Sequence, residues 1–203
     1  MHKVLIASNN AHKLQELNEI VALAGAGDAI HLVTPRELGL ALDPDETADT
    51  YLGNAQIKAR AFKNLPGLGD LAGLYVMADD SGVEVDALGG RPGLLSARYS
   101  KAAPGGDGCA ALLAELRNVP DEKRAARFRC VIVLITPDGQ EHAVEGVCEG
   151  SIGHEKRGAG GFGFDPVFVP QGESRHLAEL SPDEKHLISH RGIAARKVLT
   201  ILL

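Results

Sequence analysis

Residues 3–25 have the sequence KVLIASNNAHKLQELNEIVALAG, in which one structural pattern gives way to another. Its first part, Lys3 to Ser8, is an apolar run that ends at polar Asn9 and Asn10, as expected for a buried strand. From His12 to Gly25 the apolar residues recur at helical spacing: Leu14, Leu17, Ile20, Val21 and Ala24. A strand, a short polar loop and a helix in this order predict the opening of an α/β domain.

The rest of the chain continues this mixture of strand and helix patterns. Strands are expected at 32–34, 74–78 and 83–87, the last two separated by a turn at 79–82, and at 127–136 and 142–148, joined as a hairpin by the turn 137–139. Helices are expected between an acidic loop, 43–49, and Phe62, around 110–116, and from a capping box at 181–184 to the C-terminus. We therefore expect an α/β fold, with a mixed central β-sheet flanked by helices, in a single domain spanning residues 1–203.

Composition excludes several classes of function. The chain has 27 acidic and 21 basic residues, a net charge of −6, and only 4% aromatic residues. These features disfavour binding to a nucleic-acid backbone or to single-stranded bases. The longest apolar run, Val131 to Ile135, is too short to span a bilayer, and the N-terminus lacks the apolar core of a signal peptide. The expected location is the cytoplasm, where Cys109, Cys130 and Cys148 would be buried, reduced thiols.

The densest group of acidic residues is Asp79-Asp80-Ser81-Gly82, followed by Glu84 and Asp86. Adjacent carboxylates repel each other unless a cation or a proton separates them. Mg²⁺ commonly takes one or two carboxylates and completes its coordination with water and phosphate oxygens. The group thus indicates a Mg²⁺ site, and the alternative, a turn with solvated acids, is equally compatible with these residues.

Two loops have the composition of ligand-binding segments. The first, Ser8 to Lys13, joins a strand to a helix, where free backbone N–H groups and Lys13 would attract an anion, although an Asn-capped helix start is the simpler alternative. The second, Gly158 to Gly163, fits G-x-G-x-x-G, but Pro166 and Pro170 prevent the helix that a dinucleotide site requires. It predicts a loop that approaches a ligand closely, with Phe162 as a stacking surface and Asp165 as an acceptor.

Three residues near the last helix, Lys185, His190 and Arg191, could bind phosphate or the edge of a base, or form a solvated helix face. His186 and His190 have the spacing of a zinc pair, but H-E-x-x-H is absent from the sequence, so a zinc site is not expected. G-x-x-x-x-G-K-[ST] and G-x-S-x-G are absent too, which excludes a P-loop and gives no support to a serine nucleophile.

Taken in order, these segments resemble the inosine/xanthosine triphosphate pyrophosphatases. The matching segments span the chain: 8–13, 54–60, 78–90, 92–93, 96–99, 160–166, Lys185 and 189–192. Of these, the run D-D-S-G-V-E-V-D-A-L-G-G at 79–90 is the most specific. The resemblance implies hydrolysis of ITP, dITP and XTP to a monophosphate and pyrophosphate. The rival functions are a related pyrophosphatase for other nucleotides and a catalytically silent nucleotide-binding module.

The resemblance also implies roles for individual residues. Asp80 would be catalytic and a Mg²⁺ ligand, Glu46, with Asp45 beside it, would supply a second ligand, and Ser81 would contact the substrate. The triphosphate would bind Ser8, Asn9, Asn10, Ala11, His12 and Lys13. The base would bind Phe162, Gly163, Phe164 and Asp165, with polar recognition from Lys185, His190 and Arg191.

The family has two lobes with the active site in the cleft between them, and it forms homodimers. The sequence adds mild support for a dimer. The apolar strand of the hairpin 127–148 would be an aggregation risk as an open edge, which a second subunit or, equally well, a helix of the same chain could cover. The loop from Gly89 to Tyr99 could join the same interface.

Overall fold

The computed structural model describes residues 1–65 and 73–203, which form two compact units. Unit 1 comprises Met1–Asp80, Cys130–Gly146 and Arg191–Leu203, and unit 2 comprises Ser81–Arg129 and Val147–His190. Each unit therefore combines separate pieces of the chain. The single domain and the cleft between two lobes stay predictions.

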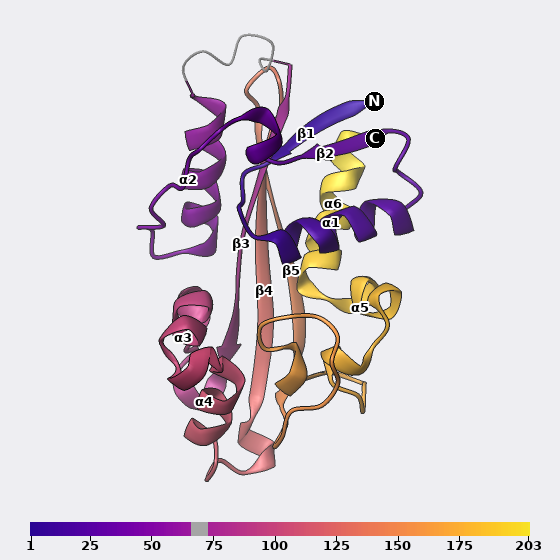
Figure 1. The fold of residues 1–203 in the computed structure, drawn as a ribbon. Helices are drawn as coiled ribbons and strands as arrows, with labels where there is room; N and C mark the ends of the chain where they lie inside the picture. The colour runs from indigo at the N-terminus through magenta and orange to yellow at the C-terminus, as the bar shows by residue number, and fades with distance from the viewer. Residues whose placement is uncertain (66–72) are drawn as a thin grey trace. The chain divides into compact units, whose positions relative to one another are not determined.

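The described residues contain six strands and six α-helices, labelled in Figure 1. The strands are β1 His2–Ile6, β2 Ile30–Val33, β3 Tyr75–Val85, β4 Ala125–Ile135, β5 Glu141–Ile152 and β6 Phe168–Pro170. The helices are α1 Ala11–Leu23, α2 Tyr51–Lys63, α3 Ser96–Ala102, α4 Gly108–Glu115, α5 Pro182–Ile188 and α6 His190–Leu202.

The strands form one mixed sheet in the order β2-β1-β3-β4-β5-β6. β1 is parallel to β2 and to β3, whereas β5 is antiparallel to β6. The hairpin of β4 and β5 closes through the predicted turn, where Gly139 N donates to Thr136 O at 3.0 Å. The predicted mixed sheet flanked by helices is thus confirmed.

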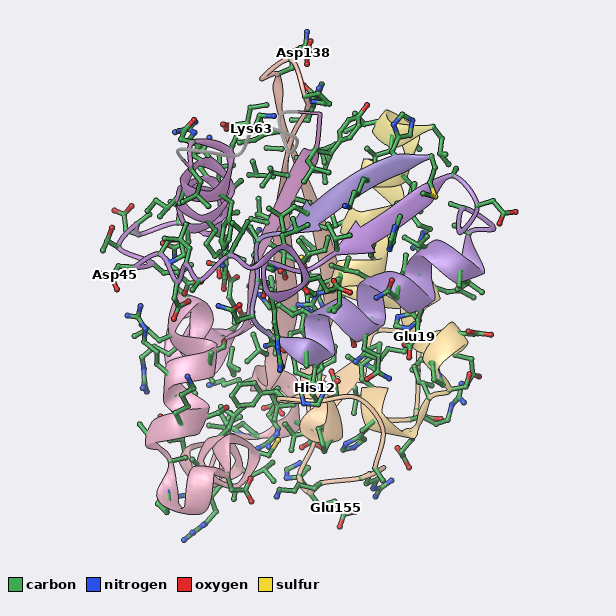
Figure 2. The ribbon with its side chains drawn as sticks, turned by 45° about the horizontal axis from the view of Figure 1, so that its top comes forward. His12, Glu19, Asp45, Lys63, Asp138 and Glu155 are labelled. Atoms are coloured by element: carbon green, nitrogen blue, oxygen red, sulfur yellow. The ribbon has the colours of Figure 1, made fainter. Side chains whose placement is uncertain are left out.

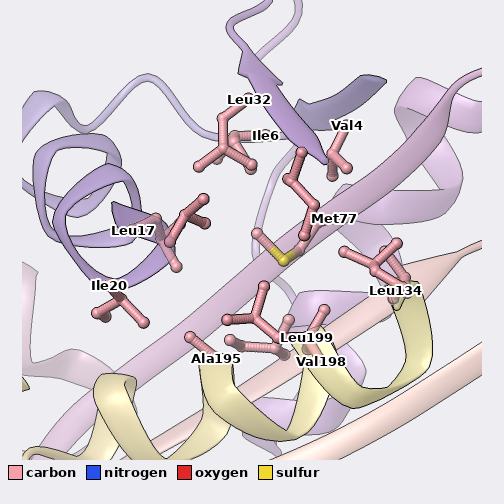
Figure 3. Close-up of a cluster of buried hydrophobic side chains, with 14 of the residues drawn as sticks. Val4, Ile6, Leu17, Ile20, Leu32, Met77, Leu134, Ala195, Val198 and Leu199 are labelled. Atoms are coloured by element: carbon pink, nitrogen blue, oxygen red, sulfur yellow. The ribbon is translucent and has the colours of Figure 1, made fainter. Parts of the chain in front are cut away.

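In unit 1 the strands are buried on both faces because successive side chains enter different helix layers. Val4 and Ile6 of β1 pack with Met77 of β3 in a core that α1 and α6 cover. Figure 3 shows this cluster, including Leu17 and Ile20 of α1 and Val198 and Leu199 of α6. On the other side, strand residues Leu5, Val76 and Ala78, with Ala7 just after β1, pack against α2 (Figure 1), whose contributing residues are Ala55, Ala59 and Phe62.

Unit 2 has its own hydrophobic core. Leu112 and Leu116, from α4 and the residue that ends it, pack with Val83 and Val85 of β3, and all four side chains are fully buried. The centre of the Phe168 ring in β6 lies 4.7 Å from the centre of the Phe128 ring, which belongs to the same core. Although β6 has only three residues, it therefore contributes a buried aromatic side chain to this core.

The turn predicted at 79–82 is wrong, because β3 runs without interruption from Tyr75 to Val85. Asp, Ser and Gly favour turns when exposed, but here the segment is part of β3, a strand of the six-stranded sheet, and both Asp79 and Asp80 are buried. Ser96 also accepts a hydrogen bond from Val83 N at 3.0 Å, which holds the strand beyond the two acids. Tertiary pairing thus overrides the local turn preference.

The continuous C-terminal helix predicted from Ser181 is also wrong. Its capping box is present, since Ser181 N donates to the Glu184 carboxylate at 2.9 Å. However, α5 ends at Ile188 and Ser189 is extended, with φ −69° and ψ 153°. The break lies where the chain passes from unit 2 to unit 1, so that α6 can pack in the unit 1 core.

The hairpin does not present its apolar strand as an open edge, so that strand needs no cover from a second subunit. β4 lies between β3 and β5, so its backbone has a neighbour on each side. The three cysteines are free and buried, and burial raises the pKa of the Cys109 thiol to about 11 and that of Cys130 to about 12. None of the described helices combines the length and apolarity needed to cross a membrane.

Two leucines of α1 test the packing of unit 1. Leu17 is 2% exposed and belongs to the core, whereas Leu23 is 43% exposed. We expect Leu17→Ala to lower the free energy of unfolding by about 2–5 kcal/mol, because it leaves a cavity. Leu23→Ala, the same change on the same helix, should cost less than about 1 kcal/mol. Urea denaturation of both variants measures the difference, and equal losses would contradict this packing.

Candidate active site

Asp79 and Asp80 are neighbours in β3, and their side chains enter different layers of unit 1. Met77 packs with α1 and α6, and Asp79, two residues further along the strand, faces the same side. Ala78 packs with α2, and Asp80 shares that side. The two carboxylates therefore do not share one site, and each has its own set of cations.

Asp79 is held by two basic residues from the layer of α1 and α6. Its Oδ2 lies 3.0 Å from Lys13 Nζ and 3.1 Å from the Arg191 guanidinium, which also pairs with Glu16. Burial alone would raise the pKa of Asp79, but Lys13 and Arg191, with Lys58, hold that pKa well below its ordinary value. Arg191 is only 1% exposed, so the structure places its guanidinium in a buried ionic network.

Asp80 meets a second group of polar side chains, carried by α2. Its carboxylate accepts hydrogen bonds from Asn54 Nδ2 at 3.2 Å and from Lys58 Nζ at 3.3 Å. Lys58 Nζ also donates to Glu46 Oε1 at 2.6 Å, so that one ammonium joins two carboxylates. Burial raises the pKa of Asp80, with a further contribution from Glu46, and Lys58 only partly offsets this.

The acidic loop before α2 reaches this group through Glu46. Asn54 Oδ1 accepts a hydrogen bond from Ala48 N at 3.0 Å, which ties the loop to the helix. Asp45, in contrast, is exposed and lies at the outer edge of its loop (Figure 2). The structure thus distinguishes two adjacent acids that the sequence alone did not separate.

The first loop is an Asn-capped helix start. Asn10 Oδ1 accepts from His12 N at 3.0 Å and from Lys13 N at 3.3 Å, and Asn10 N donates to Ser8 Oγ. These amides are therefore occupied by side chains of the loop itself. Asn9, Asn10, Ala11 and His12 are exposed, and Figure 2 shows His12 at the start of α1.

In unit 2 the glycine-rich loop surrounds a buried ion pair. Lys185 Nζ lies 2.6 Å from Asp165 Oδ2, and these side chains are 6% and 3% exposed. Phe162 N donates to the same carboxylate at 2.7 Å, and Lys185 Nζ lies 5.3 Å from the centre of the Phe162 ring. A Cβ at Gly161 would lie 2.1 Å from Asp165 Oδ2, so glycine is required for this close approach.

The remaining candidates of unit 2 differ in exposure. Phe164 is buried in the core, 6.1 Å from the Tyr99 ring, and His190 is stacked on the ring of Phe128 at 4.6 Å. Gly163 is exposed and its carbonyl accepts a hydrogen bond from Cys109, while Ser81 is half-buried. The structure therefore brings together Phe162, Asp165 and Lys185, and it places Phe164 behind them in the core.

Sequence analysis missed Glu16 as a site residue, and it gave Asn54 and Lys58 no role beyond their place in the matching segment 54–60. A signal was available for all three. Asn54 and Lys58 are four residues apart on α2, and Lys13 and Glu16 are three apart on α1, so each pair shares a helix face. Polar residues on a helix face that also carries buried apolar residues indicate buried ionic contacts.

The described residues thus define an α/β protein in which buried carboxylates and their lysine partners gather at strand β3. The chain belongs to the Ham1 family, whose model matches residues 4–201.

Similar proteins of known name extend this assignment. A dITP/XTP pyrophosphatase of Corynebacterium glutamicum strain R is 46% identical over 200 residues, covering 96% of this chain and 93% of that protein. The structure of a HAM1 protein from Coxiella burnetii matches with a TM-score of 0.82 and 36% identity, covering 100% of this chain and 98% of that one. A nucleoside-triphosphatase, also named dITP/XTP pyrophosphatase, from Mycobacterium abscessus matches with a TM-score of 0.69 and 42% identity, covering 99% and 100% of the two chains.

The buried network around Asp79 predicts a pH-dependent stability. Asp79→Asn should lower the free energy of unfolding at pH 7 by about 3 kcal/mol, because Lys13 and Arg191 lose a buried partner. Since folding lowers the pKa of Asp79 from 3.8, its contribution is present above that pH and is lost as the pH falls toward the folded-state pKa. Urea denaturation at steps from pH 7 to about pH 3 should show the gap to wild type narrowing below about pH 4. A gap that stays constant would contradict this assignment.

Proposed function

We propose that the protein hydrolyses the aberrant purine nucleotides ITP, dITP and XTP to the monophosphate and pyrophosphate, and so removes them from the nucleotide pool. The observation that carries the proposal is the convergence of Glu46 and Asp80 on the single ammonium of Lys58. Two carboxylates held around a cation, one of them in the middle of a buried strand, form a ready site for a metal-bound triphosphate. The names of the similar proteins, dITP/XTP pyrophosphatases, support the same activity.

The cofactor that we propose is Mg²⁺, and the donor chemistry fits it. Among the described residues there is no group of three or more His, Cys, Asp or Glu placed to hold a metal ion. Mg²⁺ does not need one, because it commonly uses one or two carboxylates and fills its remaining positions with water and phosphate oxygens. Glu46 and Asp80 are such a pair, since they already share a cationic partner.

The bond that breaks is the anhydride between the α- and β-phosphates. A water molecule attacks the α-phosphorus, its proton passes to a carboxylate, for which Asp80 is our candidate, and pyrophosphate leaves. When bound, Mg²⁺ would neutralise phosphate charge. Lys13 and the residues around it, Ser8, Asn9, Asn10, Ala11 and His12, would bind the triphosphate, and Ser81 would contact the substrate.

In the proposed function, residues of unit 2, together with Arg191, recognise the base. The ring of Phe162 offers a stacking surface beside Lys185, whose ammonium is a donor suited to the O6 acceptor of hypoxanthine or xanthine. Adenine carries an amino group at that position and would leave such donors unpaired. Gly163, Phe164 and Asp165 would shape this site, with His190 and Arg191 contributing further polar groups.

We also propose that the enzyme is a cytoplasmic homodimer. Three buried free thiols suit a reducing compartment. Leu95, 54% exposed, lies just before α3, which begins at Ser96 within the segment 89–99 that was expected to be a loop. Its side chain is available for a subunit interface. Sedimentation at micromolar concentration should give twice the chain mass of 21.4 kDa, and a single species at the chain mass would contradict the dimer.

The carboxylate pair is tested by three matched substitutions. Asp80→Asn should lower kcat for ITP at least about a hundredfold, because it removes the proposed proton acceptor. Glu46→Gln should raise the Mg²⁺ concentration needed for half-maximal rate about tenfold or more. Asp45→Asn, the control at the exposed neighbour, should change neither. Pyrophosphate release with and without Mg²⁺ measures all three, and a folded Asp80→Asn protein with the parent rate would refute the role of Asp80.

The base site is tested by substrate choice and by one glycine. We expect kcat/KM for ITP and XTP to exceed that for ATP at least about a hundredfold. Gly161→Ala should raise KM for ITP about tenfold with little change in kcat, because its Cβ would displace Asp165 and Lys185. Gly172→Ala is the control, since Gly172 also has a positive φ but has no other atom within 4 Å of an added Cβ. Equal values for ITP and ATP would refute the proposed base preference.

A further inference from the structure

Arg124, the residue immediately before β4, is a buried cation in unit 2. It is 2% exposed, and its guanidinium donates four hydrogen bonds. Nε donates to Ile152 O at 2.7 Å, NH2 to Gly153 O at 2.6 Å, and NH1 to Leu116 O at 2.7 Å and Val119 O at 3.3 Å. All its side-chain hydrogen-bond partners within the described residues are main-chain carbonyls. Burial lowers the pKa of Arg124, and the charge of Asp121 offsets this only in part.

These carbonyls belong to two segments that are far apart in the sequence. Leu116 and Val119 lie at the end of α4, whereas Ile152 and Gly153 lie where β5 gives way to residues 153–163, which we call the base loop. The main chain of Arg124 reinforces the second contact, since Ile152 N donates to Arg124 O at 3.0 Å. The planar guanidinium thus fixes the start of the base loop against the end of α4.

At its start the base loop also has a main-chain hydrogen bond, from Gly153 N to Val167 O at 2.8 Å. Its side-chain contacts with the surroundings are exposed or lie further along. The His154–Asp121 and Lys156–Asp107 pairs are exposed, and exposed pairs contribute little to stability. At the far end, Gly160 N donates to Ala178 O at 2.9 Å and Phe162 N to Asp165. Arg124 is therefore the buried side-chain anchor at the start of the base loop, and Phe162 lies near the other end of that loop.

We propose that Arg124 is a positioning residue for base recognition. By holding the carbonyls of Ile152 and Gly153, it sets the path of the base loop and thereby the place of Phe162 beside Lys185. The inference rests on the proposed function, because the base loop matters to substrate choice only if the protein selects purine nucleotides. Arg124 itself contacts neither base nor phosphate; it acts only through the main chain of the base loop.

Kinetics of matched variants test the role in selection. Arg124→Lys keeps the charge but cannot reach four carbonyls, and Arg124→Met keeps the length without any donor. Both variants should raise KM for ITP about tenfold and leave kcat within about threefold of wild type. Both should also reduce the preference for ITP over ATP, and these changes should be larger in Arg124→Met than in Arg124→Lys. Arg117→Met is the control, because Arg117 is an exposed arginine of the same segment. Unchanged KM and preference in both folded variants would overturn the proposal, as would an equal loss of kcat for ITP and ATP at unchanged KM.

Hydrogen exchange in the absence of nucleotide tests the positioning without relying on activity. Peptides covering 153–163 should exchange faster in Arg124→Lys than in wild type, while peptides of α1 and α2 stay unchanged. Unchanged exchange in 153–163 would overturn the proposal even if activity fell. Loss of folding in both Arg124 variants would also overturn it, because Arg124 would then be needed for the whole unit rather than for one loop. If wild-type protein fails to hydrolyse ITP, the proposed function fails, and the exchange result still decides whether Arg124 positions the loop.

Discussion

β3 is buried on both faces, and this constraint governs the arrangement of unit 1. A strand between two helix layers must send alternate side chains into each layer, so the consecutive acids Asp79 and Asp80 have to find separate partners. Asp79 pairs with Lys13 and Arg191, and Asp80 contacts Lys58 and Asn54. The repulsion expected between neighbouring carboxylates is thus resolved by the sheet itself, before any bound cation is considered.

The separation also gives the two acids different electrostatic character. Two buried cations in direct contact hold the pKa of Asp79 down, whereas burial and Glu46 raise that of Asp80. Pairs of carboxylates whose environments push their pKa values apart commonly divide their tasks. Asp79 therefore acts as the fixed anion of a structural network that joins α1, β3 and α6, whereas Asp80 is the acid for which we propose a chemical role.

Periodicity allowed much of the fold to be predicted. Local sequence signals correctly predicted four features of the structure. They are the strand at Lys3, the helix after His12, the hairpin and the capping box at Ser181. The continuity of β3 and the break at Ser189 were not predicted, because each depends on contacts with distant segments. Asp80 and Glu46 could be proposed as candidates from the resemblance, but the buried network of Glu16 with Arg191 and the core position of Phe164 are tertiary facts.

Unit 2 also contains a buried carboxylate and a buried lysine, but a loop rather than a strand encloses them. Its buried pair, Asp165 and Lys185, is enclosed by a loop whose glycines permit main chain to approach the carboxylate directly. Replacing such a pair by apolar residues is often neutral for stability, so its worth lies in the arrangement that it imposes. A loop wrapped on a fixed charge pair holds one conformation more strictly than a loop packed on apolar atoms.

The unbroken strand from Tyr75 to Val85 limits how the length of this chain can vary. Deleting or inserting one residue shortly before Asp79 would shift the strand by one position and exchange the layers that the two acids enter. Asp79 would then face Lys58, and Asp80 would face Lys13 and Arg191. Point substitutions within β3 can be absorbed one contact at a time, but a one-residue change in length alters every contact together. Variation in length among relatives should therefore accumulate in the connections around β3 and leave the strand itself constant.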